Sequence, residues 1–323
     1  MNPDFIALAQ QSPKRIVLPE SSDDRILQAA VAADQKGIAK ITLLGDPAVI
    51  NTQLEKLNLS LGNISIVHPE TSNNNYATNL FKLREKKGMT QAQADKISLQ
   101  PLYFGDLMVQ AGDADACVAG VINSTGNVIR AALHVLGTET PTTRLSSFFI
   151  MLLEAPLESP VLFADCAINI DPDAEILADI AIQSAKNAKK LLGMDPKIAM
   201  LSFSTNGSAK HISVDKVREA TDLVKEQAPE LYIIGEIQLD AAMSKRVLAT
   251  KWPDSDFQAP ANIFVFPSLE AGNIGYKIAE RFGNATAVGP ILQGLAKPVN
   301  DLSRGADVEA IINTIAVTCL QCE

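Results

Sequence analysis

Short apolar runs alternate with helical segments along most of this chain, and that alternation limits the folds open to it. The runs are rich in aliphatic residues, and several end in proline, glycine or small polar residues. We predict strands at residues 15–18, 40–44, 116–121, 198–203, 231–234 and 263–266. Buried parallel strands joined by helical crossovers explain this pattern, so the sequence predicts an α/β fold.

The predicted helices carry apolar residues on one side, as expected for helices that cover a sheet. They span residues 23–37, 173–192, 214–227 and 308–320. Ser213 stands directly before the third of these helices and is a candidate N-cap. Residues 154–160 and 249–260 each contain two prolines and are expected to be surface connections.

The size and charge of the chain bound its organisation and its partners. At 323 residues with 47% hydrophobic content, it exceeds what one core usually organises, so two domains or one domain with a large insertion are expected. The net charge of -9 is spread over the whole length, and the isoelectric point is near 5.0. This balance argues against nucleic-acid or anionic-membrane partners, and a phosphate-bearing substrate would need a local cluster of Arg, Lys and backbone N–H groups.

The sequence also bears on the compartment. Its start lacks the apolar core of a signal peptide and no run of eighteen apolar residues occurs, so a cytoplasmic protein is predicted. The four cysteines lie mostly among aliphatic residues, which favours reduced thiols. They are Cys117, Cys166, Cys319 and Cys322. The last two form a C-x-x-C, for which a redox pair or half of a zinc site is the alternative interpretation. The three histidines lack metal-ligand spacing, so no metal site is predicted.

A polar cluster near the C-terminus is the clearest candidate for chemistry. Residues 300–305 read NDLSRG and precede the predicted terminal helix, so Ser303 and Arg304 are expected at a turn that leads into a helix N-terminus. Free N–H groups and the helix dipole favour a phosphate there. Arg304 would add a bidentate contact, and the Ser303 hydroxyl would donate to an oxyanion. A capped helix start with a surface arginine explains the same residues.

A second candidate lies at residues 120–130, which read GVINSTGNVIR. An apolar strand runs there into small polar residues before a helix begins, and such turns at the carboxyl ends of parallel strands commonly bind small ligands. Ser124 and Thr125 supply hydroxyl groups, and Arg130 can point back toward the same turn at the carboxyl end of the strand. Helix capping is again the alternative explanation.

Two further segments join apolar runs to polar residues. Residues 201–211, LSFSTNGSAKH, lack both the Gly-x-Gly-x-x-Gly of a dinucleotide site and the Gly-Lys-Ser/Thr of a P-loop, which argues against hydride transfer and nucleotide triphosphate hydrolysis. Residues 270–277, EAGNIGYK, contain two glycines that allow close backbone approach, and Lys277 can reach an anion. A turn with a snorkelling lysine is the alternative. A serine hydrolase is disfavoured because no Gly-x-Ser-x-Gly elbow occurs.

Taken together, these segments resemble the short form of the phosphate acetyltransferase (phosphotransacetylase) family, from about residue 15 to the C-terminus. The matching stretches include RIVLPESSDDRILQAA, STGNVIRAALHVLGT, LFADCAINIDPD and GPILQGLAKPVNDLSRG. The wordings SFSTNGSAKH and FPSLEAGNIGYK are similar to the subtype associated with ethanolamine utilisation.

The resemblance implies two α/β/α domains similar to those of isocitrate and isopropylmalate dehydrogenases, with the active site in a cleft between them. The expected domains are residues 1–143 with 297–323, and residues 144–296. It also implies a homodimer that converts acetyl-CoA and phosphate to CoA and acetyl phosphate. Coenzyme A is then a substrate, the other partners are small molecules, and no metal, nicotinamide or other cofactor is needed.

Carried over residue by residue, the family's catalytic Ser-Arg pair falls on Ser303 and Arg304. Its two further site arginines fall on Arg130, which would assist with phosphate, and on Arg84, which would meet the CoA. The expected substrate-binding residues also include Ser124, Thr125, Asn273, Tyr276 and Lys277. The implied mechanism is direct transfer in a ternary complex, in which a CoA thiolate attacks the acetyl carbonyl and phosphate leaves.

One position departs from the family's pattern. Members usually carry a carboxylate seven residues after the serine, where it is thought to help deprotonate the thiol, and this chain has Ala310 there. Asp307 and Glu309 are close in sequence, but helical spacing points them elsewhere. A thiol with a pKa near 8.5 is only a few per cent ionised at neutral pH, so a slower enzyme is expected rather than an inactive one.

Three alternatives stay open from the sequence. A phosphate butyryltransferase shares the fold and differs in its acyl pocket. A non-catalytic relative that binds CoA or acetyl phosphate would fit the loss at Ala310. A metal- and NAD-dependent decarboxylating dehydrogenase would need clustered aspartates and a nucleotide motif. The candidate aspartates for that metal, which are scattered along the sequence, are Asp165, Asp171, Asp173 and Asp240.

Overall fold

The chain is organised in two compact units. The computed structural model describes residues 4–72, 74–140, 144–154 and 159–322. One unit comprises Asp4–Thr143 together with Leu295–Glu323, and we call it the terminal unit. The other comprises Arg144–Gly294, and we call it the central unit. The predicted second boundary, at 296/297, lies close to the division after Gly294.

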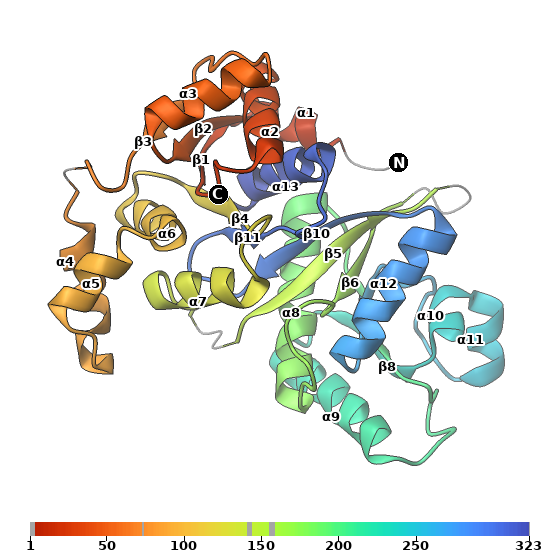
Figure 1. The fold of residues 1–323 in the computed structure, drawn as a ribbon. Coiled ribbons are helices and arrows are strands. Elements are labelled where there is room, and N and C mark those ends of the chain that lie inside the picture. The colour runs from red at the N-terminus through yellow and green to blue at the C-terminus, as the bar shows by residue number, and fades with distance from the viewer. Residues whose placement is uncertain (1–3, 73, 141–143, 155–158, 323) are drawn as a thin grey trace. The chain divides into compact units, whose positions relative to one another are not determined.

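The terminal unit is built on a five-stranded parallel sheet with the order β11-β4-β1-β2-β3 (Figure 1). Its strands are β1 (Lys14–Leu18), β2 (Ala39–Leu44), β3 (Ser65–Val67), β4 (Ala116–Ala119) and β11 (Val299–Asp301). The chain adds β2 and β3 on one side of β1, and β4 and β11 on the other. The strand order therefore reverses between β1 and β4, where the carboxyl ends of parallel strands leave room for a ligand.

Helices cover both faces of this sheet. They are α1 (Phe5–Gln10), α2 (Asp24–Gln35), α3 (Pro47–Lys56), α4 (Tyr76–Arg84), α5 (Gln91–Ile97), α6 (Pro101–Ala111), α7 (Thr125–Val135) and α13 (Val308–Gln321), with a 3-10 turn at Glu85–Lys87. Helices α2 and α13 pack together on one face, and α6 and α7 lie on the other (Figure 1). Val17 and Cys117 point toward α6, where Gly105 allows the helix to approach the sheet closely.

The central unit contains a six-stranded mixed sheet with the order β10-β5-β6-β9-β7-β8. Its strands are β5 (Ser146–Leu152), β6 (Val161–Ala164), β7 (Lys197–Leu201), β8 (Tyr232–Ile237), β9 (Ile263–Val265) and β10 (Thr286–Gln293). Strands β6, β9, β7 and β8 are parallel, whereas β5 is antiparallel to both β10 and β6. The α/β class is confirmed, and the strands predicted from the sequence all form parallel pairs, whereas β5 and β10, which the sequence did not predict, pair antiparallel.

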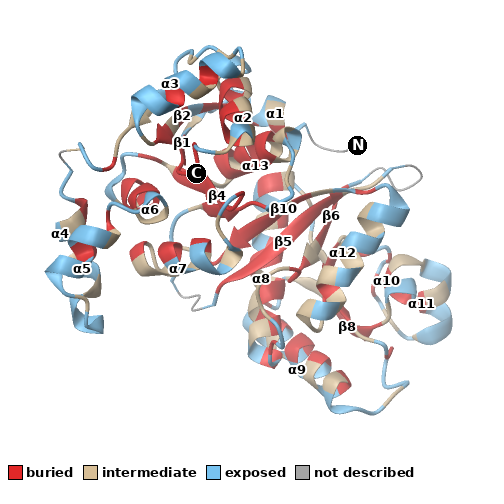
Figure 2. Cartoon of the chain, viewed as in Figure 1, coloured by how far each residue is buried: buried red, intermediate tan, exposed pale blue. Residues whose placement is uncertain are grey.

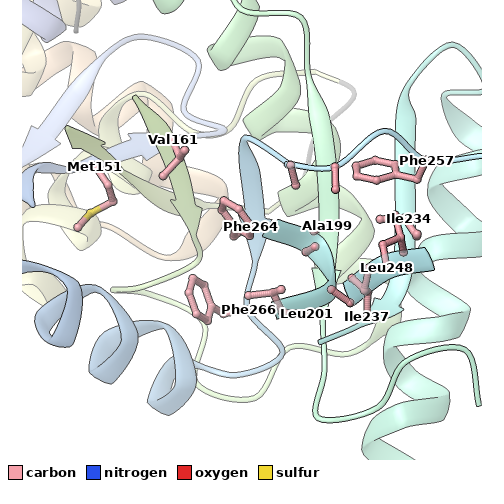
Figure 3. Packing of buried hydrophobic residues seen from close by; sticks show 14 of the residues in the cluster. Met151, Val161, Ala199, Leu201, Ile234, Ile237, Leu248, Phe257, Phe264 and Phe266 are labelled. Carbon is pink, nitrogen blue, oxygen red and sulfur yellow. The ribbon is translucent and has the colours of Figure 1, made fainter. Parts of the chain in front are cut away.

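The helices of the central unit are α8 (Ala174–Leu192), α9 (Ile212–Gln227), α10 (Leu239–Met243), α11 (Lys245–Lys251) and α12 (Leu269–Gly283). Helix α8 packs against the sheet and α9, while α10, α11 and α12 contribute to a core with the opposite face. Figure 3 shows this core, in which Phe264 and Phe266 of the β9 region lie near Leu201 of β7. In both units the strands are mostly buried and the outer sides of the helices are exposed (Figure 2).

Two local predictions need correction. Helix α9 is capped by His211 rather than Ser213, because the helix starts at Ile212 and the backbone N–H of Ser213 donates to His211 Nδ1 at 3.2 Å. The predicted surface connection at 249–260 is partly core, since Phe257 is buried and stacks on Tyr232. Within the other predicted connection, 154–160, residues 155–158 lie outside the described residues.

The cysteines are free thiols, and Cys117, Cys166 and Cys319 are buried. The predicted C-x-x-C near the C-terminus spans the end of α13, where Cys319 Sγ lies 3.6 Å from the carbonyl oxygen of Ile38. Across the part of the chain that the structure describes, none of the helices combines the length and the apolar character of a membrane span.

Candidate active site

A pocket of about 500 Å³ opens in the terminal unit where the strand order reverses. Pro19 and Glu20 follow β1, and Ile122 and Asn123 follow β4, so the pocket lies at the carboxyl ends of these adjacent strands. Its remaining wall comes from the first turn of α6 and from α7. The lining residues on these helices and their flanks are Gln100, Pro101, Leu102, Tyr103, Asn127 and Arg130. Its volume is within the usual range of small-molecule sites.

The loop between β4 and α7 is held by a buried carboxylate. Glu20 accepts hydrogen bonds from the four consecutive backbone N–H groups of residues 120–123, at 2.7 to 3.2 Å. Asn123 Nδ2 donates to the same side chain at 2.9 Å. Because these donors converge on one carboxylate, the loop has a fixed shape beside the pocket.

Ser303 and Arg304 form an exposed turn directly after β11. The backbone N–H of Gly305 donates to Ser303 Oγ at 3.2 Å, and the N–H of Ala306 donates to the Ser303 carbonyl at 2.9 Å. Among the described residues, none forms an ion pair with the guanidinium of Arg304. The turn therefore offers a cation whose hydrogen-bonding groups are available to an anion.

The local structure around this turn differs from the prediction in two ways. Asn300 and Asp301, which the sequence placed in a polar cluster before the turn, belong to a buried strand. The amino end of α13 is capped by the Asp307 side chain, which accepts from the backbone N–H of Ala310 at 2.8 Å. A capping carboxylate at this position makes the helix N-terminus a poor phosphate site, so the predicted anion site would have to be formed by the turn itself.

Arg25 fixes the backbone of the Ser303 turn. Its Nη1 donates to the carbonyl oxygens of Arg304 at 2.9 Å and of Ala306 at 2.8 Å. The Asp23 carboxylate binds the same guanidinium at 2.8 Å and holds it in place. The hydrogen bonds from Arg25 keep the pKa of Asp23 below its ordinary value, so this pair is charged at neutral pH.

Helix α7 presents three of the predicted site residues. Ser124 is its N-cap residue by position but makes no side-chain capping bond, so the capping explanation fails for its hydroxyl. Thr125 Oγ1 donates to Asp301 Oδ2 at 2.5 Å, which ties α7 to the residue two before Ser303. Arg130 is exposed on the pocket wall, where Nη1 donates to Asn127 Oδ1 at 3.0 Å.

The positive charges of Arg84 and Arg130 both affect the pKa values of two neighbouring side chains, His134 and Tyr103. Tyr103 Oη lies 2.9 Å from His134 Nδ1, and both residues are partly buried. Burial lowers the pKa of His134, and the positive charges of Arg84, Arg130 and Lys87 lower it further. His134 is therefore neutral at pH 7, and the positive charge of this region belongs to Arg84, Arg130 and Lys87.

Asn273, Tyr276 and Lys277 lie on α12 of the central unit. The alternative of a turn at 270–277 is wrong, since these residues form continuous helix, whereas the expected close backbone approach is present, because Gly272 lets that helix approach the backbone of Asp165 and Cys166. Asn273 Nδ2 donates to the Cys166 carbonyl at 3.1 Å, and Lys277 Nζ donates to Asn273 Oδ1 at 2.7 Å.

Tyr276 is fixed by an aromatic contact, because its ring stacks on Phe149 with centroids 4.2 Å apart. The Lys277 ammonium lies 5.6 Å from the centroid of the Tyr276 ring. Within the described part of the chain, no group of His, Cys, Asp and Glu has the arrangement of a metal site.

Three residues that matter to this geometry were missed from the sequence. Glu20 and Arg25 lie in the stretch PESSDDR after β1, where their charges read as an ordinary solvated loop and helix start. Asp301 stands inside NDLSRG but was assigned no role. Contacts across a hundred or more residues bring Glu20 to residues 120–123 and Arg25 to Arg304, and local patterns carry no signal for such contacts.

Comparison with known proteins gives a consistent result. The model of the Phosphate acetyl/butaryl transferase family matches residues 2–319. The chain is 46% identical over 308 residues to the phosphate acetyltransferase of Bacillus subtilis, covering 95% of this chain and 94% of that protein. It is 44% identical to the phosphate acetyltransferase of Clostridium acetobutylicum, covering 98% and 96% of the two chains.

Solved structures agree. A phosphotransacetylase from Streptococcus pyogenes superimposes with a TM-score of 0.93 at 41% identity, covering 98% of each chain. EutD phosphotransacetylase from Staphylococcus aureus gives 0.91 at 42% identity, covering 99% of this chain and 98% of that one. A putative 4-hydroxythreonine-4-phosphate dehydrogenase from Salmonella typhimurium gives 0.55 at 12% identity, covering 96% and 99% of the chains, so the fold alone is shared with a dehydrogenase.

Proposed function

Because the chain belongs to the Phosphate acetyl/butaryl transferase family, we propose that it transfers an acetyl group between coenzyme A and inorganic phosphate. The reaction is acetyl-CoA plus phosphate giving CoA plus acetyl phosphate, and the protein is an acyltransferase. The observation that carries this proposal is the exposed turn of Ser303 and Arg304, whose backbone Arg25 fixes at the carboxyl edge of the parallel sheet.

In the proposed mechanism, a CoA thiolate attacks the acetyl carbonyl carbon and the phosphate oxygen leaves with the bonding electrons. The Arg304 guanidinium holds the phosphoryl oxygens with two parallel N–H donors. The Ser303 hydroxyl donates to the carbonyl oxygen as negative charge develops on it. Both groups are exposed on a turn whose backbone is already positioned, so little ordering is needed when substrates bind.

The two further arginines are proposed to bind different substrates, one phosphate and the other CoA. Arg130 on the pocket wall is proposed to bind phosphate, and Arg84 to bind the phosphate groups of CoA. Their shared effect on His134 supports a common positive region beside Tyr103. A chain with a net charge of -9 needs such a region to attract two anionic substrates.

Further substrate contacts are proposed for Ser124, Thr125, Asn273, Tyr276 and Lys277. Ser124 has a hydroxyl free of any capping role, and Lys277 is an exposed ammonium on α12. Coenzyme A enters as a substrate, and the reaction as written needs no other cofactor.

The assembly and the compartment are also part of the proposal. We propose a cytoplasmic homodimer of the kind expected from the sequence. Ile274, Ile278 and Phe282 form an exposed apolar stripe along α12, with Phe282 88% exposed, and a second copy would cover it. Light scattering on the intact protein tests this, with Phe282→Glu expected to give monomers. A wild-type monomer at micromolar concentration would contradict the dimer.

The function is tested by mixing metal-depleted protein with CoA and acetyl phosphate and following thioester absorbance, with butyryl phosphate in parallel. We expect thioester from acetyl phosphate with a clear preference over butyryl phosphate. Preference for butyryl phosphate would move the assignment to the butyryltransferase, although both relatives described above are named phosphate acetyltransferases. CoA binding without product from either would identify a non-catalytic relative.

A further inference from the structure

One buried carboxyl group beside the candidate active site lacks the partners that such a group normally collects. Asp301 is 1% exposed, and its Oδ2 accepts a hydrogen bond from Thr125 Oγ1 at 2.5 Å. Its Oδ1 has no hydrogen-bond partner among the described residues. Buried polar atoms are nearly always paired, so an orphan oxygen two residues from Ser303 requires an explanation.

The position of this carboxyl group is tightly determined. The backbone N–H of Leu302 donates to the Ala119 carbonyl at 2.7 Å, which extends the pairing of β11 with β4 by one residue. A side chain at Gly120 would bring its Cβ within 2.3 Å of Asp301 Oδ1 and 2.5 Å of the Leu302 nitrogen. Only glycine fits there, so the Asp301 carboxyl lies directly against the loop that borders the pocket.

The surroundings of Asp301 have opposing effects on the pKa of its carboxyl group. Burial raises the pKa of Asp301 to about 7, against the hydrogen bond from Thr125. The Glu20 carboxylate after β1 raises the pKa further, while the Leu302 N–H and the Arg304 charge lower it. Asp301 therefore changes its protonation state near neutral pH, as a group that exchanges protons during catalysis must.

Thr125 connects this carboxyl group to the outside. Its side chain is only partly buried, at the first position of α7 beside exposed Ser124. While Oγ1 donates to Asp301, its lone pairs remain able to accept a hydrogen bond from a group on the solvent side. A proton donor bound there reaches Asp301 through one hydroxyl group.

We propose that Asp301, acting through the Thr125 hydroxyl, takes up the proton that the CoA thiol loses in the transfer reaction. The thiol proton passes to Thr125 Oγ1 as the Thr125 proton passes to Asp301 Oδ2. The sulfur electron pair then forms the C–S bond, the C–O bond to phosphate breaks, and Asp301 later releases its proton to solvent by the same route. Asp301 is a positioning residue, because only Thr125 contacts the substrate. This inference rests on the proposed acetyl transfer.

The other carboxylates near the turn are less suited to this task. Asp307 is engaged as the N-cap of α13, and Glu309 is exposed on the first turn of that helix. Ala310 supplies no carboxylate. Glu20 already accepts hydrogen bonds from five donors of the 120–123 loop, so its oxygens are occupied.

The test is the pH dependence of kcat/KM for CoA in the direction that starts from CoA and acetyl phosphate, between about pH 5.5 and 8.5. The wild-type value should fall below about pH 7 as Asp301 becomes protonated. Asp301→Asn keeps the acceptor for Thr125 but holds no exchangeable proton. It should lower kcat about 100-fold at pH 7.5 and lose the limb near pH 7, with the KM for acetyl phosphate unchanged.

A matched pair of variants separates this role from packing. Thr125→Val removes the hydroxyl at nearly constant volume and should reproduce the loss, whereas Thr125→Ser keeps the hydroxyl and should retain most of the rate. A wild-type pH profile in folded Asp301→Asn, or full activity in Thr125→Val, would overturn the inference. If Asp301→Asn does not fold, the Thr125 pair decides alone. An inactive wild-type protein would instead count against the proposed function.

Discussion

In both units of this chain, a buried carboxylate at the end of a strand accepts hydrogen bonds from a loop that follows that strand or a neighbouring one. The units differ in how many hydrogen bonds their other buried carboxyl groups accept. In the terminal unit, Glu20 gathers the backbone N–H groups of residues 120–123. In the central unit, Asp165 after β6 gathers the N–H groups of Ala167, Ile168 and Asn169, together with the Ser147 hydroxyl. In each case a buried carboxylate shapes the loop that leaves a strand.

The units differ in another buried carboxyl group on a strand, which is Asp301 of β11 in the terminal unit and Glu236 of β8 in the central unit. Glu236 of β8 accepts from Ser204 Oγ at 2.9 Å, from the Gly207 N–H at 2.8 Å and from Arg218 Nε at 3.2 Å. Burial alone would raise the pKa of Glu236, but these donors outweigh it and leave the pKa below its ordinary value. Asp301 has one side-chain donor, and its pKa lies near 7. A saturated carboxylate stabilises a loop, whereas an unsaturated one can exchange a proton.

The largest effect should follow from removing the exposed cation of the terminal unit. Arg304→Ala should lower kcat by about 10²–10³-fold, because the phosphoryl oxygens lose their donor in the transition state. The fold should be unchanged, since the side chain is exposed. Steady-state assays measure this, with Arg281→Ala, an exposed arginine of the central unit, as the matched control. Equal losses in both variants, or near-normal turnover of Arg304→Ala, would refute the role of Arg304.

Opposite effects on stability should follow when each unit loses one buried carboxylate. A native pKa of about 7 against 3.8 means that the folded state holds a proton that the unfolded state releases, so this contribution to stability is lost as pH rises toward 7. Asp301→Asn should therefore raise the free energy of unfolding by about 4 kcal/mol at pH 8, with the gain vanishing toward pH 4. Asp165→Asn should lower it by about 3 kcal/mol, because five donors lose a charged acceptor.

Urea denaturation at several pH values measures both changes. A loss of stability at pH 8 in Asp301→Asn comparable to that in Asp165→Asn would remove the distinction between the two carboxyl groups.

A moderate effect is expected at Arg25, whose hydrogen bonds to the Ser303 turn reach backbone carbonyl oxygens. Arg25→Ala should lower kcat about tenfold, because the turn loses the order that aligns Ser303 and Arg304 with the reacting groups. Arg15, which pairs with Asp115 at the other end of β1, provides the control. Stopped assays should show kcat unaffected in Arg15→Ala; an equal decrease there would point to general loosening of the unit.

The smallest effect concerns the helix position that lacks a carboxylate. If Asp301 already accepts the thiol proton, Ala310→Asp should change the wild-type rate by about twofold or less, yet restore part of the rate lost in Asp301→Asn. The pH profiles of the four combinations form a double-mutant cycle. A large gain in the wild-type background would show that thiol ionisation limits the enzyme and that Asp301 does not fulfil the task.

The sequence predicted most of the elements that obey a simple period and few of those that depend on distant pairing. Strands β1, β2, β7 and β9 and helices α2 and α8 lie where apolar periodicity places them. Strand β10 was missed because Gly289 and Pro290 interrupt its apolar run, and these two residues lie at a register shift against β5. For the segment that forms α12 the sequence left a turn open as an alternative, because glycines are typical of turns, and here they serve close helix packing instead.

The candidate site divides along the same line. The sequence predicted five site residues because they follow strands, and the structure places all of them in the terminal unit. They are Ser303, Arg304, Ser124, Thr125 and Arg130. Their supports, Glu20, Arg25 and Asp301, act through contacts between segments far apart in the chain. Local composition does not predict such contacts, and it does not show whether a charged residue is buried.

The most direct test of this account is the titration of the Asp301 carboxyl carbon by 13C NMR in the intact, aspartate-labelled protein, with Asp301→Asn providing the assignment. The account predicts a midpoint near pH 7. A midpoint near the ordinary value of about 3.9 would show that Asp301 is ionised throughout the working range and would contradict its role as the proton acceptor.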